Sequence, residues 1–361
     1  MPVECRSPAY PHLADGRVEA ALLDWYDVQA RDLPWRSPPG APPPDPYRVW
    51  LSEIMLQQTT TAAAAPYFAR FVARWPTVEA LAAADEGELM AAWAGLGYYA
   101  RARNLLTAAR AVAAGGGRFP DSEEGLRALP GVGAYTAAAV AAIAFGRRAL
   151  VIDANVERVA ARLAAIEVPL PAAKPAIRAA VDAMTPECRA GDFAQAMMDL
   201  GATICTPRQP DCPQCPVRRS CAVATSDKAD RLPLKAPKAA KPHRRGIAWW
   251  IEAEDAIWLV RRPAKGMLGG MRALPDDGWR AGSDGSGLPP FDAEWRDLGE
   301  VDHVFTHFRL TLALRLARVG RDDMLGREGI WTPIAALDDA GLPTLFAKVV
   351  RLAREKRHER V

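Results

Sequence analysis

Four cysteines in one short segment are the residues whose type and spacing most clearly predict chemistry. Four thiols lie within seventeen residues, in the pattern Cys205-x6-Cys212-x2-Cys215-x5-Cys221. Four thiolates at this density can bind one metal centre. The spacing alone fits a four-thiolate zinc site and a [4Fe–4S] cluster about equally well.

Two carboxylates, Glu53 and Asp153, stand in contexts that suit acid–base and electrostatic catalysis. Glu53 lies among apolar residues of the stretch 50–59. An isolated glutamate is more often exposed, but these neighbours indicate partial burial and therefore a raised pKa. Asp153 follows the apolar pair Val151–Ile152 and precedes a predicted helix. The simplest interpretation is that Asp153 is an N-cap. Backbone amides and the helix dipole keep an aspartate in that position ionised.

Two glycines, Gly131 and Gly133, predict a tight turn within the stretch Leu129–Ala137. The amides of such a turn, where a helix begins, can bind phosphate. A single G-x-G is a weak signal because most are plain turns. Here it lies between two predicted helices, as in a helix–hairpin–helix, which binds the DNA backbone without reading its sequence.

The elements that must position these residues are helical from Gly16 to about Thr225. Apolar periodicity predicts helices at Arg17–Ala30, Tyr47–Thr61, Ala62–Trp75, Ala100–Ala114, Thr136–Phe145 and Asn155–Ile166. After Arg245 the pattern is typical of strands and one closing helix. The predicted elements there are a hairpin of Ile247–Ala253 and Ala256–Arg262, a half-buried strand at Phe308–Ala317 and a helix at Leu345–Lys356.

A basic segment separates the two parts. Lys228–Arg245 contains seven Lys or Arg residues, one acidic residue and three prolines, without apolar periodicity. We interpret it as a semi-extended tether, which is compatible with contact to DNA phosphates. The predicted domains are therefore an all-α domain at 16–226, a linker at 227–245 and an α+β domain at 246–361.

Length and composition set wider limits. The chain has 361 residues, enough for two or three domains, and its 46 basic and 43 acidic residues leave a net charge of +3, too small to identify a partner. No signal peptide is evident, and no apolar run approaches the roughly 20 residues that span a membrane. We expect a cytoplasmic protein of bacterial type without a membrane partner. In that compartment cysteines favour metal binding over disulfides. Cys5 and Cys188 lie outside the motif and receive no role.

Several motifs, in order along almost the whole chain, resemble the MutY-type adenine DNA glycosylases of the helix–hairpin–helix superfamily. They are Pro46–Thr59, Leu96–Arg101, Leu129–Ala137, Ile152–Val156 and the four-cysteine segment. The resemblance implies a multidomain fold, with an all-α glycosylase domain followed by an α+β Nudix-like domain. It also implies that Cys205, Cys212, Cys215 and Cys221 bind a [4Fe–4S] cluster rather than zinc. The expected protein is a monomer that binds duplex DNA and excises adenine paired with 8-oxoguanine or guanine in base excision repair.

The resemblance further assigns roles around the target base. Glu53 matches the general acid that protonates adenine N7, and Asp153 matches the carboxylate that stabilises the oxocarbenium-like sugar or forms an adduct with it. Tyr135 and Asn155 match polar groups around that sugar. The target adenine must leave the base stack to reach these groups. Its pocket is assigned to Arg31, Leu33, Trp35 and Gln195, and the duplex contacts to Gln58, Leu96, Tyr98, Gly131 and Gly133.

The C-terminal domain is expected to read the opposite base. Phe305-Thr306-His307 matches the family's Phe-Ser-His loop, which recognises 8-oxoguanine, a base with an N7–H donor where guanine has an acceptor. Thr306 departs from the usual serine: it keeps the hydroxyl and adds a methyl group. A Nudix hydrolase needs a metal-binding R-E-x-x-E-E helix, and the sequence has none. Recognition rather than hydrolysis is therefore expected.

Four other functions compete with this interpretation. An endonuclease III-like enzyme would carry a Schiff-base lysine where Tyr135 stands, so we expect no strand cleavage by that route. A G·T-mismatch thymine glycosylase also lacks that lysine, but the C-terminal domain argues against it. A non-catalytic DNA-binding iron–sulfur protein would not need both Glu53 and Asp153. A Nudix-type nucleotide hydrolase is the weakest alternative.

Overall fold

The computed structural model describes residues 10–224, 226–237, 240–263 and 267–357. Cys5 therefore lies outside the described residues. The chain divides into two compact units, Met1–Pro237 and Lys238–Val361, which are described separately. Among the described helices, none is long and apolar enough to cross a membrane.

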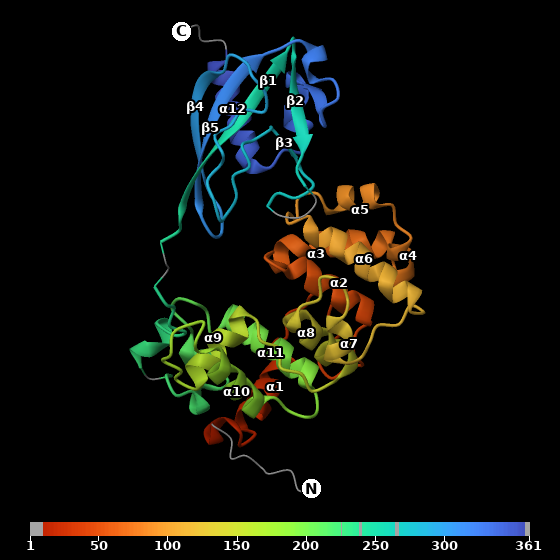
Figure 1. Ribbon diagram of the computed structural model, residues 1–361. Helices are drawn as coiled ribbons and strands as arrows, with labels where there is room; N and C mark the ends of the chain where they lie inside the picture. The colour runs from red at the N-terminus through yellow and green to blue at the C-terminus, as the bar shows by residue number, and fades with distance from the viewer. Residues whose placement is uncertain (1–9, 225, 238–239, 264–266, 358–361) are drawn as a thin grey trace, which may run out of the picture. The chain divides into compact units, whose positions relative to one another are not determined.

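The first unit is built from helices (Figure 1). They are α1 (Arg17–Gln29), α2 (Pro46–Leu56), α3 (Thr61–Arg74), α4 (Val78–Ala82), α5 (Glu86–Trp93), α6 (Ala100–Ala114), α7 (Glu123–Arg127), α8 (Ala134–Phe145), α9 (Ala154–Leu163), α10 (Lys174–Met184) and α11 (Ala190–Thr203). The predicted helices correspond to α1, α2, α3, α6, α8 and α9, so the all-α class of this part is confirmed. Helix α11 is not among the predictions because it is buried on nearly all sides and has no polar face to set a period.

Helix α8 forms the centre of this unit. Its residues Thr136–Ala144 are all buried, and six of these nine are alanines. Small side chains allow close packing, and α2, α7 and α11 all contact this helix. The alanine-rich sequence of α8 therefore brings α2, which carries Glu53, and α11, which carries Gln195, to one region.

The predicted helix Tyr47–Thr61 is too long, because α2 ends at Leu56 and α3 begins at Thr61. Gln58 adopts a left-handed conformation with φ of 59°, which interrupts the helix between them. Thr60 then caps α3 by accepting a hydrogen bond from the Ala63 amide at 3.3 Å. The apolar pattern runs through this break and hides it in the sequence. Helix α9 likewise ends before the predicted Ile166, at Leu163.

The predicted turn between two helices is confirmed by α7, the residues that follow it and α8. Gly131 has φ of +77°, and a Cβ built there would lie 2.7 Å from Asn104 Cβ. Both conformation and space therefore require glycine at this position. Gly133 is extended and is the N-cap of α8, with open space around it.

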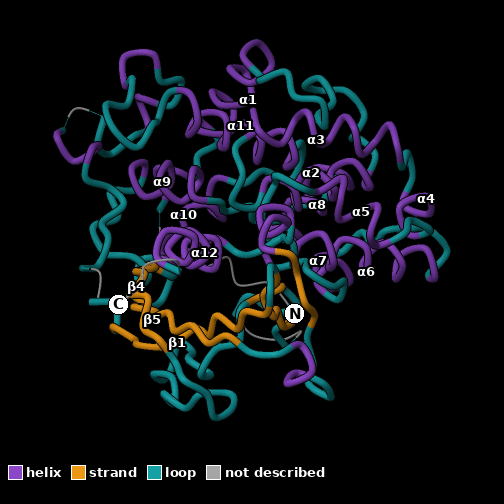
Figure 2. Tube along the Cα trace, turned by 90° about the horizontal axis from the view of Figure 1, so that it is seen from above, coloured by secondary structure: helices purple, strands orange, loops and turns teal. Residues whose placement is uncertain are grey.

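The second unit is a mixed sheet covered by a helix (Figure 2). Its strands are β1 (His243–Ala253), β2 (Ala256–Arg261), β3 (Arg272–Ala273), β4 (Arg296–Val304), β5 (Arg309–Arg318) and β6 (Ile330–Pro333). The order is β3-β2-β1-β5-β4, with β6 paired to β2; β1 and β5 are parallel, whereas β1 and β2 form the predicted antiparallel hairpin. Helix α12 (Thr344–Lys356) shares one core with the alternating leucines of β5. The α+β class is confirmed.

The basic segment 227–245 is only partly extended. It begins with a short 3-10 turn, Asp227–Asp230, and Leu232 is buried in a small cluster with Val223 and Ala229. Strand β1 already begins at His243. Residues 238 and 239 lie outside the described part. The packing was not predictable from periodicity because part of it involves a distant segment: Ala165 packs against this cluster, and Arg162 Nε donates to the Leu232 carbonyl at 3.1 Å.

Candidate active site

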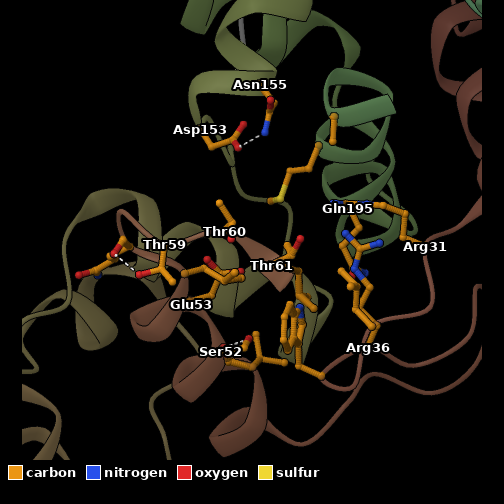
Figure 3. A pocket seen from close by; sticks show the side chains of 18 of the residues that line it. Arg31, Arg36, Ser52, Glu53, Thr59, Thr60, Thr61, Asp153, Asn155 and Gln195 are labelled. Carbon is orange, nitrogen blue, oxygen red and sulfur yellow. Dashed lines mark hydrogen bonds between the residues drawn. The ribbon is translucent and has the colours of Figure 1, made fainter. Parts of the chain in front are cut away.

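One cavity of about 530 Å³ in the first unit gathers most of the predicted active-site residues. Its walls include Arg31, Leu33, Trp35, Glu53, Gln58, Tyr135, Asp153, Asn155 and Gln195. These side chains come from α2, α8 and α11, from the start of α9 and from two loops, and Figure 3 shows several of them facing one space. A cavity of this volume suits a small ligand or a single base.

Glu53 lies on the buried side of α2, with 5% of its surface exposed. Burial raises the pKa of its carboxyl to about 7, and the charge of Asp153 acts in the same direction, while Tyr135 and Arg36 partly oppose the shift. Among the described residues, the Oε2 atom has no hydrogen-bond partner. A carboxyl with this pKa can hold a proton near neutral pH and give it to a ligand atom in the cavity.

The raised pKa of Glu53 predicts a pH-dependent loss of stability. The folded protein binds this proton more tightly than the unfolded chain, whose glutamate pKa is about 4.5. The stabilisation is therefore fully present below about pH 4.5 and is lost as the pH rises through about 7. As the pH rises from about 5 to 8, we expect the free energy of unfolding of wild type to fall relative to that of Glu53→Gln by on the order of 3 kcal/mol. Urea unfolding of both proteins measures this difference. If the free energy of unfolding depended on pH equally in both proteins, the raised pKa of Glu53 would be contradicted.

Asp153 is the N-cap of α9, as predicted. Its Oδ1 accepts a hydrogen bond from the Val156 amide at 2.7 Å, and its Oδ2 accepts one from Asn155 Nδ2 at 2.9 Å. The positive end of the α9 dipole lies at the same place. Asp153 therefore presents a hydrogen-bonded carboxylate to the cavity, while Glu53 presents a carboxyl that burial keeps protonated near neutral pH (Figure 3).

Asn155 is itself held by a buried arginine of the same helix. Arg158 Nη2 donates to Asn155 Oδ1 at 2.9 Å and to the Gly201 carbonyl at 2.6 Å, and its Nε donates to the Cys205 carbonyl at 2.8 Å. A Cβ added at Gly201 would lie 2.6 Å from Asn155 Cβ, so α11 approaches closely here because this residue is glycine. The site carboxylate and the cysteine segment thus share one hydrogen-bonded support.

Tyr135 lies in the first turn of α8 with its hydroxyl 4.0 Å from Met198 Sδ. Burial raises the pKa of this phenol well above its usual range, and the charges of Glu53 and Asp153 act in the same direction. Tyr135 is therefore a neutral hydroxyl at physiological pH. It supplies no amine for Schiff-base chemistry.

A buried ion-pair group that the sequence analysis missed holds one wall of the cavity. Asp199 is completely buried and accepts hydrogen bonds from Arg31 Nε at 2.6 Å and from both Arg36 Nη atoms at 2.6 and 2.9 Å. It lies one helical turn after Gln195 on α11. That spacing is the signal that could have found it, because residues four apart share a helix face. Arg36 also lines the cavity.

The residues assigned to duplex contact are placed differently from one another. Gln58 and Tyr98 are exposed, Tyr98 by 63%, and both have left-handed backbones with φ of 59° and 49°. Leu96 is buried, and its carbonyl accepts a hydrogen bond from Arg101 Nη2 at 3.0 Å. Its side chain packs in the core rather than at the surface. Gly131 is exposed at the turn before α8.

The segment Phe305-Thr306-His307 joins β4 to β5 in the second unit. Thr306 and His307 are exposed, whereas Phe305 stacks on Phe308, with ring centroids 4.7 Å apart. The Phe305 amide donates to the Phe308 carbonyl at 2.9 Å, which closes the turn. The two polar side chains therefore lie on a turn whose base is a pair of stacked aromatic rings.

The four cysteines line one small cavity of the first unit. Arg162 is buried beside them and donates from Nη1 to Cys205 Sγ at 3.2 Å and to the Thr206 carbonyl at 2.7 Å. Burial raises the pKa of the Cys215 thiol to about 12 and also raises that of Cys221. Thiolates at these positions therefore need compensating positive charge. Four thiols around one cavity are the donor set of a [4Fe–4S] centre, so the residues fit that group. Among the described residues, no group of three or more His, Cys, Asp or Glu side chains could hold a single metal ion.

Two protein-family models match the chain. Residues 51–179 match the model described as HhH-GPD superfamily base excision DNA repair protein, and residues 246–352 match a NUDIX domain. These matches identify the helical and the α+β units and confirm the predicted fold of each.

Curated relatives match across both units. An adenine DNA glycosylase of Arabidopsis thaliana is 34% identical over 83% of this chain and 57% of its own length, and one of Homo sapiens is 34% identical over 81% and 65%. One of Rattus norvegicus is 33% identical over 93% and 78%. The chain thus spans less than two thirds of the length of the Arabidopsis thaliana and Homo sapiens relatives. A solved structure of a thermostable thymine-DNA glycosylase is also similar, with a TM-score of 0.50 and 31% identity over 56% of this chain and 93% of that one.

Proposed function

The chain belongs to the adenine DNA glycosylases, and from that premise we propose that it excises adenine paired with 8-oxoguanine or guanine in duplex DNA by hydrolysing the N-glycosidic bond. The observation that carries the proposal is the pairing of Glu53 and Asp153 on one cavity, in environments that favour a proton on the first. Two carboxyl groups in different environments can divide acid and electrostatic work in glycoside hydrolysis.

In the proposed reaction the target adenine leaves the base stack and enters the cavity, at a cost that DNA contacts offset. Arg31, Leu33, Trp35 and Gln195 surround the base. Glu53 holds a proton in a buried environment and delivers it to adenine N7, which weakens the bond to the sugar. Its Oε2 atom supports this role, because it has no hydrogen-bond partner among the described residues.

Asp153 stabilises the positive charge that develops on the sugar as adenine departs, or attacks the sugar to form a transient adduct. Asn155 fixes the orientation of this carboxylate, and Arg158 fixes Asn155. The neutral Tyr135 hydroxyl contributes a dipole beside the same sugar. Water then completes the hydrolysis and leaves an abasic strand. The strand stays uncut, because Tyr135 stands where a Schiff-base lysine would be needed.

We further propose that the α+β unit at 246–361 reads the opposite base, while the helical unit at 16–226 performs excision and the segment 227–245 joins them. Thr306 and His307 suit this role because both are exposed polar groups on a turn closed by the stacked rings of Phe305 and Phe308. Phe305 would act as the base of that turn. Gln58 and Tyr98 would occupy the space that the flipped nucleotide leaves in the duplex.

Replacing Thr306 by valine and His307 by alanine in the full chain is expected to lower the preference for 8-oxoguanine over guanine by about ten- to hundredfold. Excision opposite guanine should change little, because the catalytic residues are intact. The measurement is single-turnover excision on both duplexes at one salt concentration. Glu328→Ala, at an exposed position of the same unit, is the control. An equal loss on both duplexes would mean that this loop contributes binding without recognition.

We propose that Cys205, Cys212, Cys215 and Cys221 hold a [4Fe–4S] cluster, which when bound supplies the positive charge that these buried thiolates need. Protein purified without oxygen should be brown and contain iron and sulfide in about a four-to-four ratio. Cys215→Ser should lose most of this iron, whereas Cys188→Ser, at an exposed cysteine, should keep it. Stoichiometric zinc without iron would refute the cluster and favour a four-thiolate zinc site.

Base release distinguishes this function from its rivals. Duplexes with adenine opposite 8-oxoguanine, adenine opposite guanine and thymine opposite guanine are incubated with excess protein. We expect adenine to be released from the first two, thymine to remain, and the abasic strand to stay uncut until alkali is added. Thymine release would favour the mismatch thymine glycosylase, and spontaneous strand cleavage with borohydride trapping would favour a lyase.

A further inference from the structure

Arg101 makes an unusual set of hydrogen bonds at the edge of the proposed site. Its Nη1 donates to the carbonyls of Ile54 and Met55, both at 3.0 Å, and to that of Gln57. These carbonyls lie at the C-terminal end of α2 and just beyond it, where the last carbonyls of a helix have no partner within the helix. A cation at this place also complements the negative end of the helix dipole.

The same guanidinium binds a second segment, forty residues further along the chain. Its Nη2 donates to the carbonyls of Leu96 at 3.0 Å and Gly97 at 3.3 Å, and to Thr59 Oγ1 at 3.3 Å. The Trp93 indole supports this turn by donating to the Gly97 carbonyl at 3.1 Å. One planar cation therefore joins the end of α2 to the turn that precedes α6.

Each joined segment presents one exposed side chain on a left-handed backbone. Gln58 lies between the two partners Gln57 and Thr59, and Tyr98 directly follows Gly97. Left-handed conformations are disfavoured for residues other than glycine and persist only where their surroundings hold them. The Arg101 guanidinium also lies 5.6 Å from the centre of the Tyr98 ring.

We infer that Arg101 is a positioning residue that holds Gln58 and Tyr98 at a fixed separation, so that both enter the duplex together when the target base leaves it. The inference rests on the proposed function, since it concerns how that function gains access to its base. A lysine would keep the charge but could not reach six carbonyl and hydroxyl groups in two segments from one planar fork. The coupling therefore depends on the guanidinium and not on charge alone.

A double-mutant cycle tests this coupling through single-turnover excision of adenine opposite 8-oxoguanine. Arg101→Lys and Tyr98→Ala are each expected to slow excision roughly tenfold or more. If Arg101 acts through Tyr98, the double variant should be within about twofold of the slower single variant. Independent roles would instead multiply, to about a hundredfold. The inference would be overturned if the two effects on the excision rate multiplied. It would also be overturned if Arg101→Lys slowed excision while Tyr98→Ala and Gln58→Ala did not.

Arg110→Lys is the matched control, because Arg110 also lies on α6 and also donates to loop carbonyls, of Ala82 at 3.2 Å and Ala84 at 3.3 Å. It should excise adenine at the wild-type rate. If Arg101→Lys behaves like this control, the inference fails. If Arg101→Lys does not fold, Thr59→Val takes the place of Arg101→Lys in the same cycle, because it removes one acceptor of the Arg101 guanidinium. Thr59→Val is expected to slow excision about threefold.

A second readout separates this inference from the proposed chemistry. Fluorescent 2-aminopurine at the target position reports unstacking and requires no bond cleavage. Wild type should raise the fluorescence, Arg110→Lys should match it, and Arg101→Lys should lose most of the increase. If wild type unstacks the base but releases no adenine, the proposed chemistry fails and the inference stands. If wild type and Arg101→Lys unstack it equally, or neither does, the inference fails whatever the chemistry.

Discussion

Replacing Glu53 by glutamine is expected to slow single-turnover excision of adenine by about 10²- to 10⁴-fold, the contribution of a general acid. The amide keeps the volume of the side chain but cannot deliver a proton to adenine N7. Burial raises the pKa of Glu53 to about 7, so the wild-type carboxyl is substantially protonated near neutral pH. Binding to mismatched DNA should be retained, because Gln58, Tyr98 and the hairpin are unchanged.

The control for this variant is Glu86→Gln, which makes the same chemical change at an exposed position in the first turn of α5. It should excise adenine at the wild-type rate. Affinity for the mismatched duplex, measured for all three proteins at one salt concentration, separates lost chemistry from lost binding. Near-normal excision by Glu53→Gln would remove Glu53 from the role of acid.

Asparagine at position 153 is expected to slow excision by about 10²- to 10³-fold, the effect of removing one preorganised electrostatic group. The substitution isolates charge from structure, because asparagine and aspartate are about equally good N-caps. The bond from the Val156 amide can remain, whereas the Asn155 amide loses its charged acceptor. The free energy of unfolding should therefore change by about 1 kcal/mol or less.

Asp85→Asn is the matched control, since Asp85 caps α5 by accepting from the Glu88 amide at 3.0 Å and is exposed. Both substitutions should have similar effects on stability, and only that at Asp153 should affect excision. If Asp153→Asn unfolds the protein more than the control and its residual folded fraction excises normally, Asp153 is a structural cap without a role in the reaction.

The residues nearest the chemistry were the most predictable from sequence. The burial of Glu53 follows from the apolar residues on either side of it, and the cap at Asp153 follows from its place before a helical pattern. The alternating leucines of β5 fixed which face of that strand is buried. Each of these signals is local, so one stretch of sequence contains all of it.

The supporting residues could not be predicted because their partners are distant. Arg31 and Asp199 are 168 residues apart, and Arg101 binds carbonyls up to 47 residues away. An arginine on an amphipathic helix is usually a solvated residue, and nothing beside Arg101 in the sequence indicates that it binds the carbonyls at the end of α2. The premature end of that helix was missed for a different reason, since the apolar pattern continues through Gln58, whose left-handed backbone interrupts the helix.

The pH dependence of adenine excision tests the central claim most directly, that a buried Glu53 protonates the leaving base. Single-turnover rates are measured with saturating protein on adenine opposite 8-oxoguanine, from about pH 5.5 to 9. The account predicts a constant rate below a pKa of about 7 and a fall of about tenfold per pH unit above it, as Glu53 loses its proton. The residual rate of Glu53→Gln should lack this transition. A wild-type rate that stays constant or rises between about pH 7 and 9 would contradict the account.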